Sequence, residues 1–344
     1  MVLARIRLPA LGRTTMPRLD PPWPPPLASG RTLERMEFAD PMATGEEEVG
    51  TASSTGSNPR SVGAPSNDQL AKPKSRSELA RFVGRATLGG FRHRRDFHDV
   101  ERFFFLVGYP RSGSTLIGSL LNAHPEMVIA HEADSLRYVR PGITRSQLFA
   151  MLLERDREFA SVERRWNGFD YSLPGLDQGR FTRLRVIGDK HAGRAARRLR
   201  DDPGLLDRLR ALAGVPIRVL HIARNPFDNI ASIARNRQLP VAQAIEIYRD
   251  LGLAVDGVRA KLAPDELHDV TYESFLREPS GEISAILSFI GVGASPEYLS
   301  SCASLVDGSG HRGRDAVEWS ADERAQVEEM AVSRPVLAGY HFED

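Results

Sequence analysis

Apolar residues gather in short continuous runs along the part of the chain that begins near residue 101. Four of these runs have the length of strands: FFFLV (103–107), RLRVIGDK (183–190), IRVLHIA (217–223) and LHDVTY (267–272). A continuous apolar run is typical of a strand that is covered on both faces, as the strands of parallel sheets are. We therefore expect these four segments to build one central sheet.

Helical patterns fill the intervals between the runs. Leu116, Ile117, Leu120 and Leu121 recur at helical spacing, and Pro125 lies just beyond them. Further helices are predicted over 203–214, after Asn225-Pro226, over 241–260, over 279–291 and after the Ser320/Glu323 capping box. Strands that alternate with helices predict an α/β fold, with three layers and a largely parallel central sheet.

The amino-terminal part of the chain has a different composition. Eleven of the 23 prolines lie in the first 73 residues, together with PPWPPP and a segment rich in Ser and Gly. Such a stretch buries too little apolar surface to offset the entropy of ordering it. We predict a disordered tail over 1–78, a basic lead-in with a short helix over 79–100, and one α/β domain over 101–344.

Charge and cysteine content restrict the class of protein. The 46 basic and 45 acidic residues nearly cancel, which argues against a dedicated nucleic-acid binder. Cys302 is the only cysteine, so the chain forms no internal disulfide and no cysteine metal cluster. No apolar run approaches the ~20 residues of a membrane helix, so stable membrane insertion is not expected. A cytoplasmic location is the expectation that fits best, and the oligomeric state stays open.

The loop GYPRSGST (108–115) follows the first apolar run and opens a helix, as a phosphate-binding P-loop does. The lysine of that motif is missing, because position 114 is Ser, and Arg111 supplies positive charge earlier in the loop. Backbone amides at a helix start favour an anion, and so do hydroxyl donors. The loop donors are Ser112, Gly113, Ser114 and Thr115. The alternative is a tight turn that binds no ligand.

A second basic motif follows the run 217–223. Arg224 stands at the carboxyl end of this strand, where ligands bind in open α/β sheets. Ser232 lies eight residues later, about two helical turns on. Together these two side chains are candidates for a second phosphate site. Taken alone, the segment Arg224-Asn225-Pro226 also fits an ordinary capped start of a helix.

Both motifs together resemble those of the sulfotransferase family, which uses 3′-phosphoadenosine 5′-phosphosulfate (PAPS). The resemblance rests on YPRSGSTLIGSLLNAHP (109–125) and VLHIARNPFDNIAS (219–232), and it covers about residues 101–344. The segment 270–292 and the ending LAGYHFED are also similar, the ending to bacterial members and the tyrosylprotein branch. It implies a P-loop-like fold in which residues 111–115 hold the 5′-phosphosulfate, while Arg224 and Ser232 hold the 3′-phosphate.

The resemblance also implies further contacts to the nucleotide. Tyr272 is expected beside it, although a buried tyrosine at a strand end is an equally good interpretation. Family members complete the 3′-phosphate site with a late basic or glycine-rich loop. HRGR (311–314) is the nearest counterpart in this chain.

The catalytic residues that the resemblance implies lie near two strand ends. In the tyrosylprotein branch a glutamate follows the loop arginine at the distance at which Glu132 follows Arg111. His131 competes with Glu132 as general base, because the cytosolic branch uses histidine. Lys190 corresponds to a lysine beside the transferring group, but the usual Lys-x-Pro is absent, and a surface lysine is the alternative.

The implied reaction is in-line transfer of the sulfuryl group from PAPS to a hydroxyl or amine, without a metal. A magnesium-dependent reaction would need a carboxylate at a strand end to hold the metal, and Asp189 is the one candidate for that role. A P-loop kinase-like phosphotransferase and a non-catalytic PAPS-fold binding module remain as alternatives. The acceptor is expected to be a small molecule, a carbohydrate or a peptide. Its pocket is expected in 133–182 and 236–262, which include Tyr138, Trp166, Phe169 and Tyr171.

Overall fold

The structure of the chain is a computed structural model that describes residues 76–166, 169–306 and 312–344. The predicted tail therefore lies outside the described residues, except for its last three positions. These positions begin helix α1 (Arg76–Arg92). The predicted boundaries at residues 78 and 100 stay predictions.

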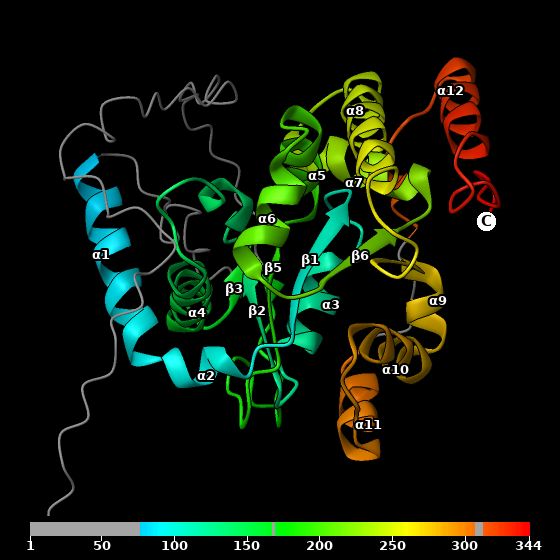
Figure 1. Cartoon of the computed structure of the whole chain (residues 1–344). Coiled ribbons are helices and arrows are strands. Elements are labelled where there is room, and N and C mark those ends of the chain that lie inside the picture. Colours follow the sequence, from blue (N-terminus) through cyan, green and yellow to red (C-terminus); the bar gives the residue numbers. More distant parts are fainter. Residues whose placement is uncertain (1–75, 167–168, 307–311) are drawn as a thin grey trace, which may run out of the picture. The chain divides into compact units, whose positions relative to one another are not determined.

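The described residues form a mixed succession of helices and strands (Figure 1). The strands are β1 (Arg102–Gly108), β2 (Met127–His131), β3 (Arg165–Trp166), β4 (Phe169–Asp170), β5 (Val186–Lys190), β6 (Ile217–Ala223) and β7 (Leu267–Thr271). After α1, the helices are α2 (Arg94–His98), α3 (Ser114–Leu121), η2 (Ser135–Tyr138), α4 (Arg145–Ser161), α5 (Ala192–Asp201), α6 (Leu205–Ala213), α7 (Pro226–Arg237), α8 (Val241–Arg259), α9 (Tyr272–Arg277), α10 (Pro279–Ile290), α11 (Pro296–Ser304), η3 (Gly313–Ala316) and α12 (Ala321–Val332).

The main sheet has the strand order β2-β5-β1-β6-β7, and every pair in it is parallel. The predicted α/β fold with a largely parallel sheet is therefore confirmed. All five strands end at the same edge, and this edge receives the loops after β1, β2, β5, β6 and β7. These loops, together with the last residues of β2 and β5, include every residue for which the sequence suggested a chemical role at a strand end.

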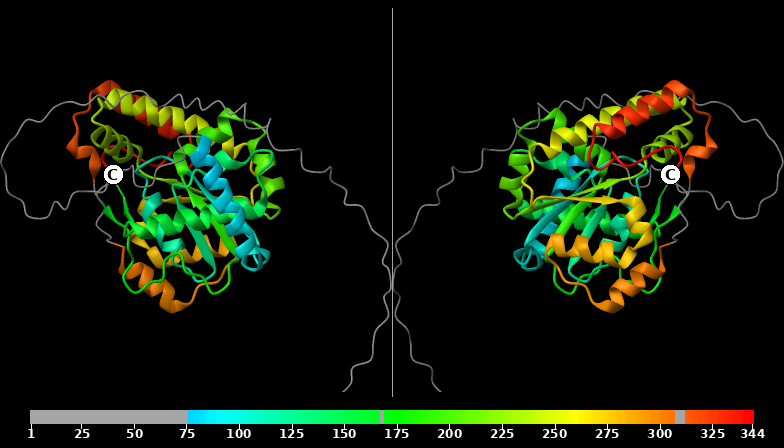
Figure 2. Two further views of the ribbon diagram at one scale, coloured as in Figure 1. Left: turned by 90° about the vertical axis from the view of Figure 1, so that its left-hand side faces the viewer. Right: turned by 90° about the vertical axis from the view of Figure 1, so that its right-hand side faces the viewer.

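Helices cover both faces of the sheet (Figures 1 and 2). Helices α3 and α10 pack against one face, with α11 beside α10, while α4, α5 and α8 cover the other. Helix α1 lies outside α4, and α12 runs beside α8 in Figure 2. The three layers leave the loops at the carboxyl edge exposed to ligands, which positions the site.

Strand β1 lies at the centre of the sheet and has the most hydrophobic surroundings. Phe103, Phe104, Phe105, Leu106 and Val107 are each at most 1% exposed. Burial of one such side chain stabilises the fold by about 1.5–3 kcal/mol. Successive residues point to opposite faces, so this one run supplies both apolar layers. The loop that follows β1 therefore starts from a rigid support.

Several predicted elements have the expected bounds, and others differ. The strands at 103–107 and 217–223 and the helices beginning at Pro226 and Pro279 are confirmed. The strand predicted over 183–190 begins only at Val186, because Arg185 turns to Glu101 and Glu126 at the sheet border. Strand β2, helix α4 and helix α5 were not predicted. Their apolar runs are short or interrupted by arginines, so the pattern was too weak to identify them.

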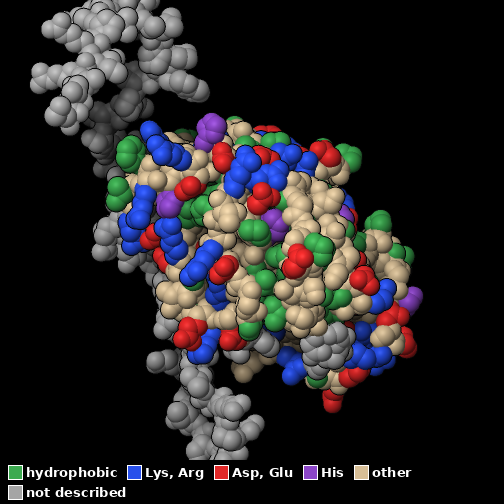
Figure 3. Space-filling view, turned by 90° about the horizontal axis from the view of Figure 1, so that it is seen from below, with side chains coloured by type: hydrophobic (Ala, Val, Ile, Leu, Met, Phe, Trp, Pro, Cys, Tyr) green, Lys and Arg blue, Asp and Glu red, His purple; other side chains and the backbone are tan. Residues whose placement is uncertain are grey.

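The molecular face at the amino ends of the strands shows no strong single-sign charge. Figure 3, viewed from below Figure 1, shows basic and acidic side chains intermixed, with small apolar areas between them. The described part of the chain contains no helix that is long and apolar enough to cross a bilayer.

Candidate functional site

The loop between β1 and α3 adopts the backbone conformation of an anion-binding turn. Three of its residues have positive φ: Gly108 at 138°, Arg111 at 70° and Gly113 at 84°. The hydroxyl of Ser112 donates to the carbonyl of Tyr109 over 2.9 Å, which closes the turn from inside. Gly113 is the N-cap of α3, so the first amides of the helix face out of the loop. This geometry places N–H donors where an anion is favoured.

Gly113 is required because the ring of Tyr272 lies directly against it. A Cβ atom at Gly113 would lie 2.3 Å from Cδ2 of Tyr272, a distance that packed atoms do not adopt. Tyr272 itself begins α9 at the end of β7. The sequence expected Tyr272 near the nucleotide, and the structure places its ring at the phosphate-loop glycine.

Two arginines join the first loop to the second motif. The Nε of Arg111 donates to Oγ of Ser232 over 3.2 Å. One guanidinium nitrogen of Arg224 donates to the carbonyl of Arg111 over 3.1 Å, and its guanidinium lies 5.1 Å from the ring centre of Tyr272. Segments 113 residues apart in the sequence are therefore in direct contact. Both arginines and Ser232 of α7 are therefore joined by hydrogen bonds beside the loop.

Glu132 meets Lys190 at the carboxyl ends of β2 and β5. The parallel register pairs His131 with Lys190, and the amide of Glu132 donates to the carbonyl of Lys190 over 3.0 Å. The Nζ of Lys190 lies 2.7 Å from Oε1 of Glu132, while Nε2 of His191 lies 2.8 Å from its Oε2. Both carboxylate oxygens of Glu132 therefore have a nitrogen partner.

The turn that carries Glu132 is strained and held by other polar groups. Glu132 and Asp134 have φ values of 50° and 55°, which non-glycine residues rarely adopt. The carboxylate of Asp189 accepts the amides of Ala133 and Ser135 over 3.0 and 2.7 Å. Arg155 donates to the carbonyl of His131 over 3.0 Å and also to that of Glu132. Asp189 thus fixes the turn of Glu132 with both of its oxygens.

The two candidates for the general base have different surroundings. Although burial alone would raise it, the pKa of Glu132 is held well below its usual value by His191 and Lys190. His131 is 4% exposed, stacks on Phe159 at 4.0 Å, and has its pKa lowered well below the usual value by burial. This arrangement favours Glu132, because it is ionised and contacts the lysine.

Lys190 reaches Glu132 across the first turns of α3. A Cβ atom at Gly118 would lie 2.9 Å from Cγ of Lys190, so only glycine leaves room for this side chain. Lys190 is 5% exposed and is not a surface lysine. The structure therefore does not support the alternative in which Lys190 is an ordinary surface residue.

A short hairpin brings aromatic side chains to the same edge. Burial raises the pKa of Tyr171, and the charge of Glu132 raises it further. The charge of Arg111 and a hydrogen bond with the side chain of Thr115 lower it. Arg111, Thr115 and Glu132 thus all influence the pKa of the Tyr171 phenol. Trp166 packs edge-on against His131 at 4.8 Å.

A buried ion pair anchors this hairpin. Arg164 donates to Asp156 over 2.9 Å and to the carbonyl of Gln178, and the amide of Asn122 donates to the same Asp156 over 2.7 Å. Of the other aromatic residues expected in an acceptor pocket, Tyr138 is 4% exposed, and the side chain of Phe169 lies outside the described residues.

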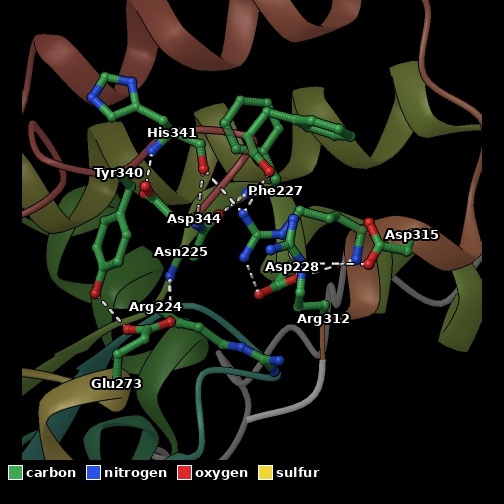
Figure 4. Close-up of polar contacts among 12 residues, drawn as sticks. Arg224, Asn225, Phe227, Asp228, Glu273, Arg312, Asp315, Tyr340, His341 and Asp344 are labelled. Carbon is green, nitrogen blue, oxygen red and sulfur yellow. Dashed lines mark hydrogen bonds and ion pairs between the residues drawn. The ribbon is translucent and has the colours of Figure 1, made fainter.

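The start of α7 is tied to the carboxyl-terminal segment (Figure 4). The amide of Asn225 donates to Oε1 of Glu273 over 2.9 Å, and the hydroxyl of Tyr340 donates to the other oxygen of Glu273. The side-chain amide of Asn225 donates to the carbonyl of His341 over 3.1 Å, and its oxygen caps α7. Glu273 thus fixes the backbone beside Arg224.

The two arginines of the late basic loop HRGR (311–314) make different contacts. Arg314 is 3% exposed and forms a two-point ion pair with Asp228 at 2.9 and 2.7 Å. It also donates to the carbonyls of His341 and Phe342. Arg312 is half exposed and contacts Asp315 at 3.3 Å, and His311 lies outside the described residues. Arg314 therefore holds α7 and the chain end together, and Arg312 is the better-exposed cation of HRGR.

The structure brings the sequence-predicted residues into two adjoining groups. The first contains Arg111, Ser112, Gly113, Ser114, Thr115, Arg224, Ser232 and Tyr272, and the second contains Glu132 and Lys190. No role was predicted from the sequence for His191, Gly118 or Glu273. Only His191 had a visible signal, since it follows Lys190 directly at a predicted strand end. Among the described residues, no group of three or more His, Cys, Asp or Glu side chains has the arrangement of a metal site.

The chain belongs to the sulfotransferase family, because the model of that family matches residues 104–296. The match includes the phosphate loop, Glu132, Lys190 and Arg224, and it ends at Pro296, the first residue of α11. No curated protein sequence matches the chain.

Several solved structures to which the chain is similar are named sulfotransferases. The sulfotransferase domain of the Synechococcus PCC 7002 olefin synthase is 19% identical, with 69% of this chain and 97% of that chain covered and a TM-score of 0.43. A sulfotransferase from Alicyclobacillus acidocaldarius is 18% identical, with coverage of 66% and 90% and a TM-score of 0.39. Mouse sulfotransferase SULT7A1, solved with PAP, is 13% identical, with coverage of 66% and 72% and a TM-score of 0.36.

Proposed function

We propose that the protein is a PAPS-dependent sulfotransferase that transfers the sulfuryl group to a hydroxyl or amine of an acceptor. The observation that carries the proposal is the meeting of two groups at one sheet edge. Arg224 and Arg111 are joined at the phosphate loop, and the Lys190–Glu132 ion pair lies at the neighbouring strand ends. Helix α3, which begins in the phosphate loop, joins the two groups, because the side chain of Lys190 packs directly on its Gly118.

The residues present suit both ends of the donor. The 5′-phosphosulfate would lie on the amides at the start of α3, with Arg111 as its cation and Thr115 as a hydroxyl donor. Arg224 and Ser232 would hold the 3′-phosphate, because they flank Arg111 on the side of α7. The ring of Tyr272 contacts both sets of residues, because it packs on Gly113 of the loop and lies beside the guanidinium of Arg224.

The transfer step needs a proton acceptor and a stabilised leaving group. The acceptor oxygen attacks sulfur and forms a new S–O bond, while its proton passes to Glu132. The bond between sulfur and the 5′-phosphate oxygen breaks, and its electron pair stays on that oxygen. Lys190, Arg111 and the loop amides would stabilise the charge that develops there. On donor binding, Lys190 would turn from Glu132 toward the leaving oxygen.

The structure offers little support for the kinase-like alternative. Asp189, the strand-end carboxylate that would hold magnesium, accepts backbone amides with both of its oxygens. Position 114 is Ser, so the loop has no P-loop lysine. Only a measurement of turnover distinguishes the non-catalytic binding module from an enzyme. The metal-free reaction, the cytoplasmic location and the class of acceptor (a small molecule, a carbohydrate or a peptide) stay predictions.

The experiment that tests the proposal is calorimetric titration with 3′-phosphoadenosine 5′-phosphate (PAP), the product nucleotide. PAP and ATP are compared in the presence of EDTA and again with added magnesium. The titration is repeated on Arg224→Ala and on Arg277→Ala, which removes an exposed arginine of α9 as the matched control.

We expect PAP alone to bind in EDTA, with affinity at least tenfold weaker for Arg224→Ala, since a charged hydrogen bond contributes about 1.5–3 kcal/mol. Arg277→Ala is expected to bind PAP as the native chain does. Binding of ATP only with magnesium, or equal PAP affinity in both variants, would refute the proposed donor. If PAP still forms from PAPS in EDTA, the protein is a metal-independent enzyme. That result would contradict both the kinase-like alternative and the non-catalytic binding module.

A further inference from the structure

The residue after Lys190 has a place in the site that the pattern of the sequence did not suggest. His191 is the N-cap of α5, yet its side chain makes no cap hydrogen bond. Its ring turns instead to Glu132, with Nε2 at 2.8 Å from Oε2. The imidazole and the Lys190 ammonium therefore hold the carboxylate of Glu132 from its two oxygens.

The other ring nitrogen of His191 indicates which tautomer is present. Nδ1 is buried and has no hydrogen-bond partner within the described part of the chain. A buried N–H without an acceptor costs about 1–3 kcal/mol, so the proton is better placed on Nε2, where Glu132 accepts it. The ring is then neutral, with a bare lone pair at Nδ1.

We propose that His191 is a positioning residue for the transfer reaction: it holds Oε2 of Glu132, so that Oε1 receives the acceptor proton once Lys190 turns to the donor. This inference rests on the proposed function. The proton moves from the acceptor oxygen to Oε1 as the O–S bond forms, and the S–O bond to the 5′-phosphate breaks. His191 keeps its Nε2 proton throughout and fixes the rotation of the carboxylate.

Charged groups from several elements surround His191. Glu132 contacts it from the turn after β2, Asp189 and Lys190 precede it on β5, and His131 lies on β2 beside Lys190. Arg155 reaches the carbonyls of His131 and Glu132 from α4. Within this cluster, His191 contacts Oε2 of Glu132 directly.

The kinetic experiment compares His191→Ala with His191→Gln, whose amide donates a hydrogen bond but does not titrate. His98→Gln is the control, because His98 is 89% exposed. PAP release from PAPS is measured with water or 4-nitrophenol as acceptor. We expect kcat to fall at least tenfold in His191→Ala, as misplacement of a reacting group by about 1 Å costs up to 100-fold. His191→Gln should recover most of kcat, because its side-chain amide can also donate a hydrogen bond to Oε2 of Glu132.

A second measurement needs no turnover. In protein with ¹⁵N-labelled histidine, the spectrum of His191→Gln assigns His191 among the nine histidines. We expect a protonated Nε2 and an unprotonated Nδ1 near neutral pH, with the Nε2–H proton signal shifted in Glu132→Gln. A proton on Nδ1, or an unchanged signal in Glu132→Gln, would overturn the inference. So would full kcat in His191→Ala.

The two proposals fail in different ways. PAP titration of the native chain tests the donor site, and each His191 variant is expected to bind PAP within twofold of it. Absence of PAP binding by the native chain would refute the proposed function. Native PAP binding together with a wrong tautomer would refute only the role of His191.

Discussion

At the scale of single residues, the site depends on side chains held in uncommon backbone conformations. Arg111 and Glu132 both have positive φ, at 70° and 50°, and each carries a proposed chemical role. Such a conformation costs on the order of 1–3 kcal/mol and persists only where the surroundings enforce it. For Glu132 the surroundings are the hydrogen bonds from the amides to Asp189 and the contacts of Arg155. The strain therefore orients the carboxylate before substrate binds.

Glu132→Gln removes the proposed proton acceptor while keeping the shape of the side chain. We expect kcat for transfer to fall by about 10²–10⁴, the usual contribution of a general base, with PAP affinity changed little. The measurement is PAP formation from PAPS beside calorimetric titration with PAP. Glu328→Gln, on the exposed side of α12, is the matched control. Equal kcat in the two variants would assign the base elsewhere.

Gly113→Ala tests the contact between the phosphate loop and Tyr272. The new methyl group would lie 2.3 Å from the Tyr272 ring, and alanine would have to adopt a φ of 84°. We expect PAP affinity to fall more than tenfold and the free energy of unfolding to fall by about 1–3 kcal/mol. Gly257→Ala is the control, because Gly257 lies within α8 with open space around it. That variant should bind PAP normally; normal binding by Gly113→Ala would contradict the proposed loop.

At the scale of elements, a buried polar pair reinforces the contact between β6 and β7. His221 faces Asp269 in the register of the two strands, and its Nδ1 lies 2.7 Å from the carboxylate. Arg259, the last residue of α8, donates to the other oxygen of Asp269 over 2.8 Å. The contact joins two strands and a helix directly below the loop, since His221 also neighbours Gly108.

Asp269→Asn should show the pH dependence of this contact. Burial alone would raise the pKa of Asp269, but His221 and Arg259 lower it far below its usual value. A lowered carboxyl pKa stabilises the fold above the unfolded value of about 3.9 and loses that contribution as the pH falls further. We expect the variant to be less stable than the native chain at pH 7, on the order of 1 kcal/mol because Asp269 is partly exposed.

Urea unfolding between pH 7 and pH 3 measures this difference. It should shrink as the pH falls below about 4. Asp265→Asn is the control, since Asp265 is 75% exposed and 3.5 Å from Arg218. A difference for Asp269→Asn that stays constant over this range would mean that its charge does not stabilise the sheet.

At the scale of the whole molecule, the site is assembled from segments between residues 102 and 344. The loop after β1, the turn after β2 and the ends of β5, β6 and β7 meet at one edge, and the chain end covers the start of α7 (Figure 4). Every proposed site residue lies on these segments. The predicted tail supplies none of them.

Deletion of residues 1–75 therefore tests the predicted division of the chain. We expect the shortened protein to unfold cooperatively at the same temperature within a few degrees and to bind PAP within twofold of the full chain. Thermal unfolding and calorimetric titration provide the measurements. A large loss of PAP affinity with unchanged stability would show that the tail takes part in the donor site.

The sequence by itself determined the alternation of strands and helices and the chemistry of the phosphate loop. FFFLV and IRVLHIA are continuous apolar runs, and their meaning does not depend on distant residues. The turn chemistry of Gly108, Gly113 and Asn225-Pro226 is likewise local, because it depends on φ preference and capping. For the same reason the expected family could be identified from short segments.

Tertiary structure alone decided the partners across the sheet. Parallel register places Glu132 beside Lys190, 58 residues away, and this brings His191 to the second oxygen of Glu132. Packing also buried Arg314 against Asp228 and gave both oxygens of Asp189 to the turn of Glu132. These contacts join residues far apart in the chain, and no local pattern encodes which strand lies next to which. The choice of neighbours follows from burying both faces of the sheet at once.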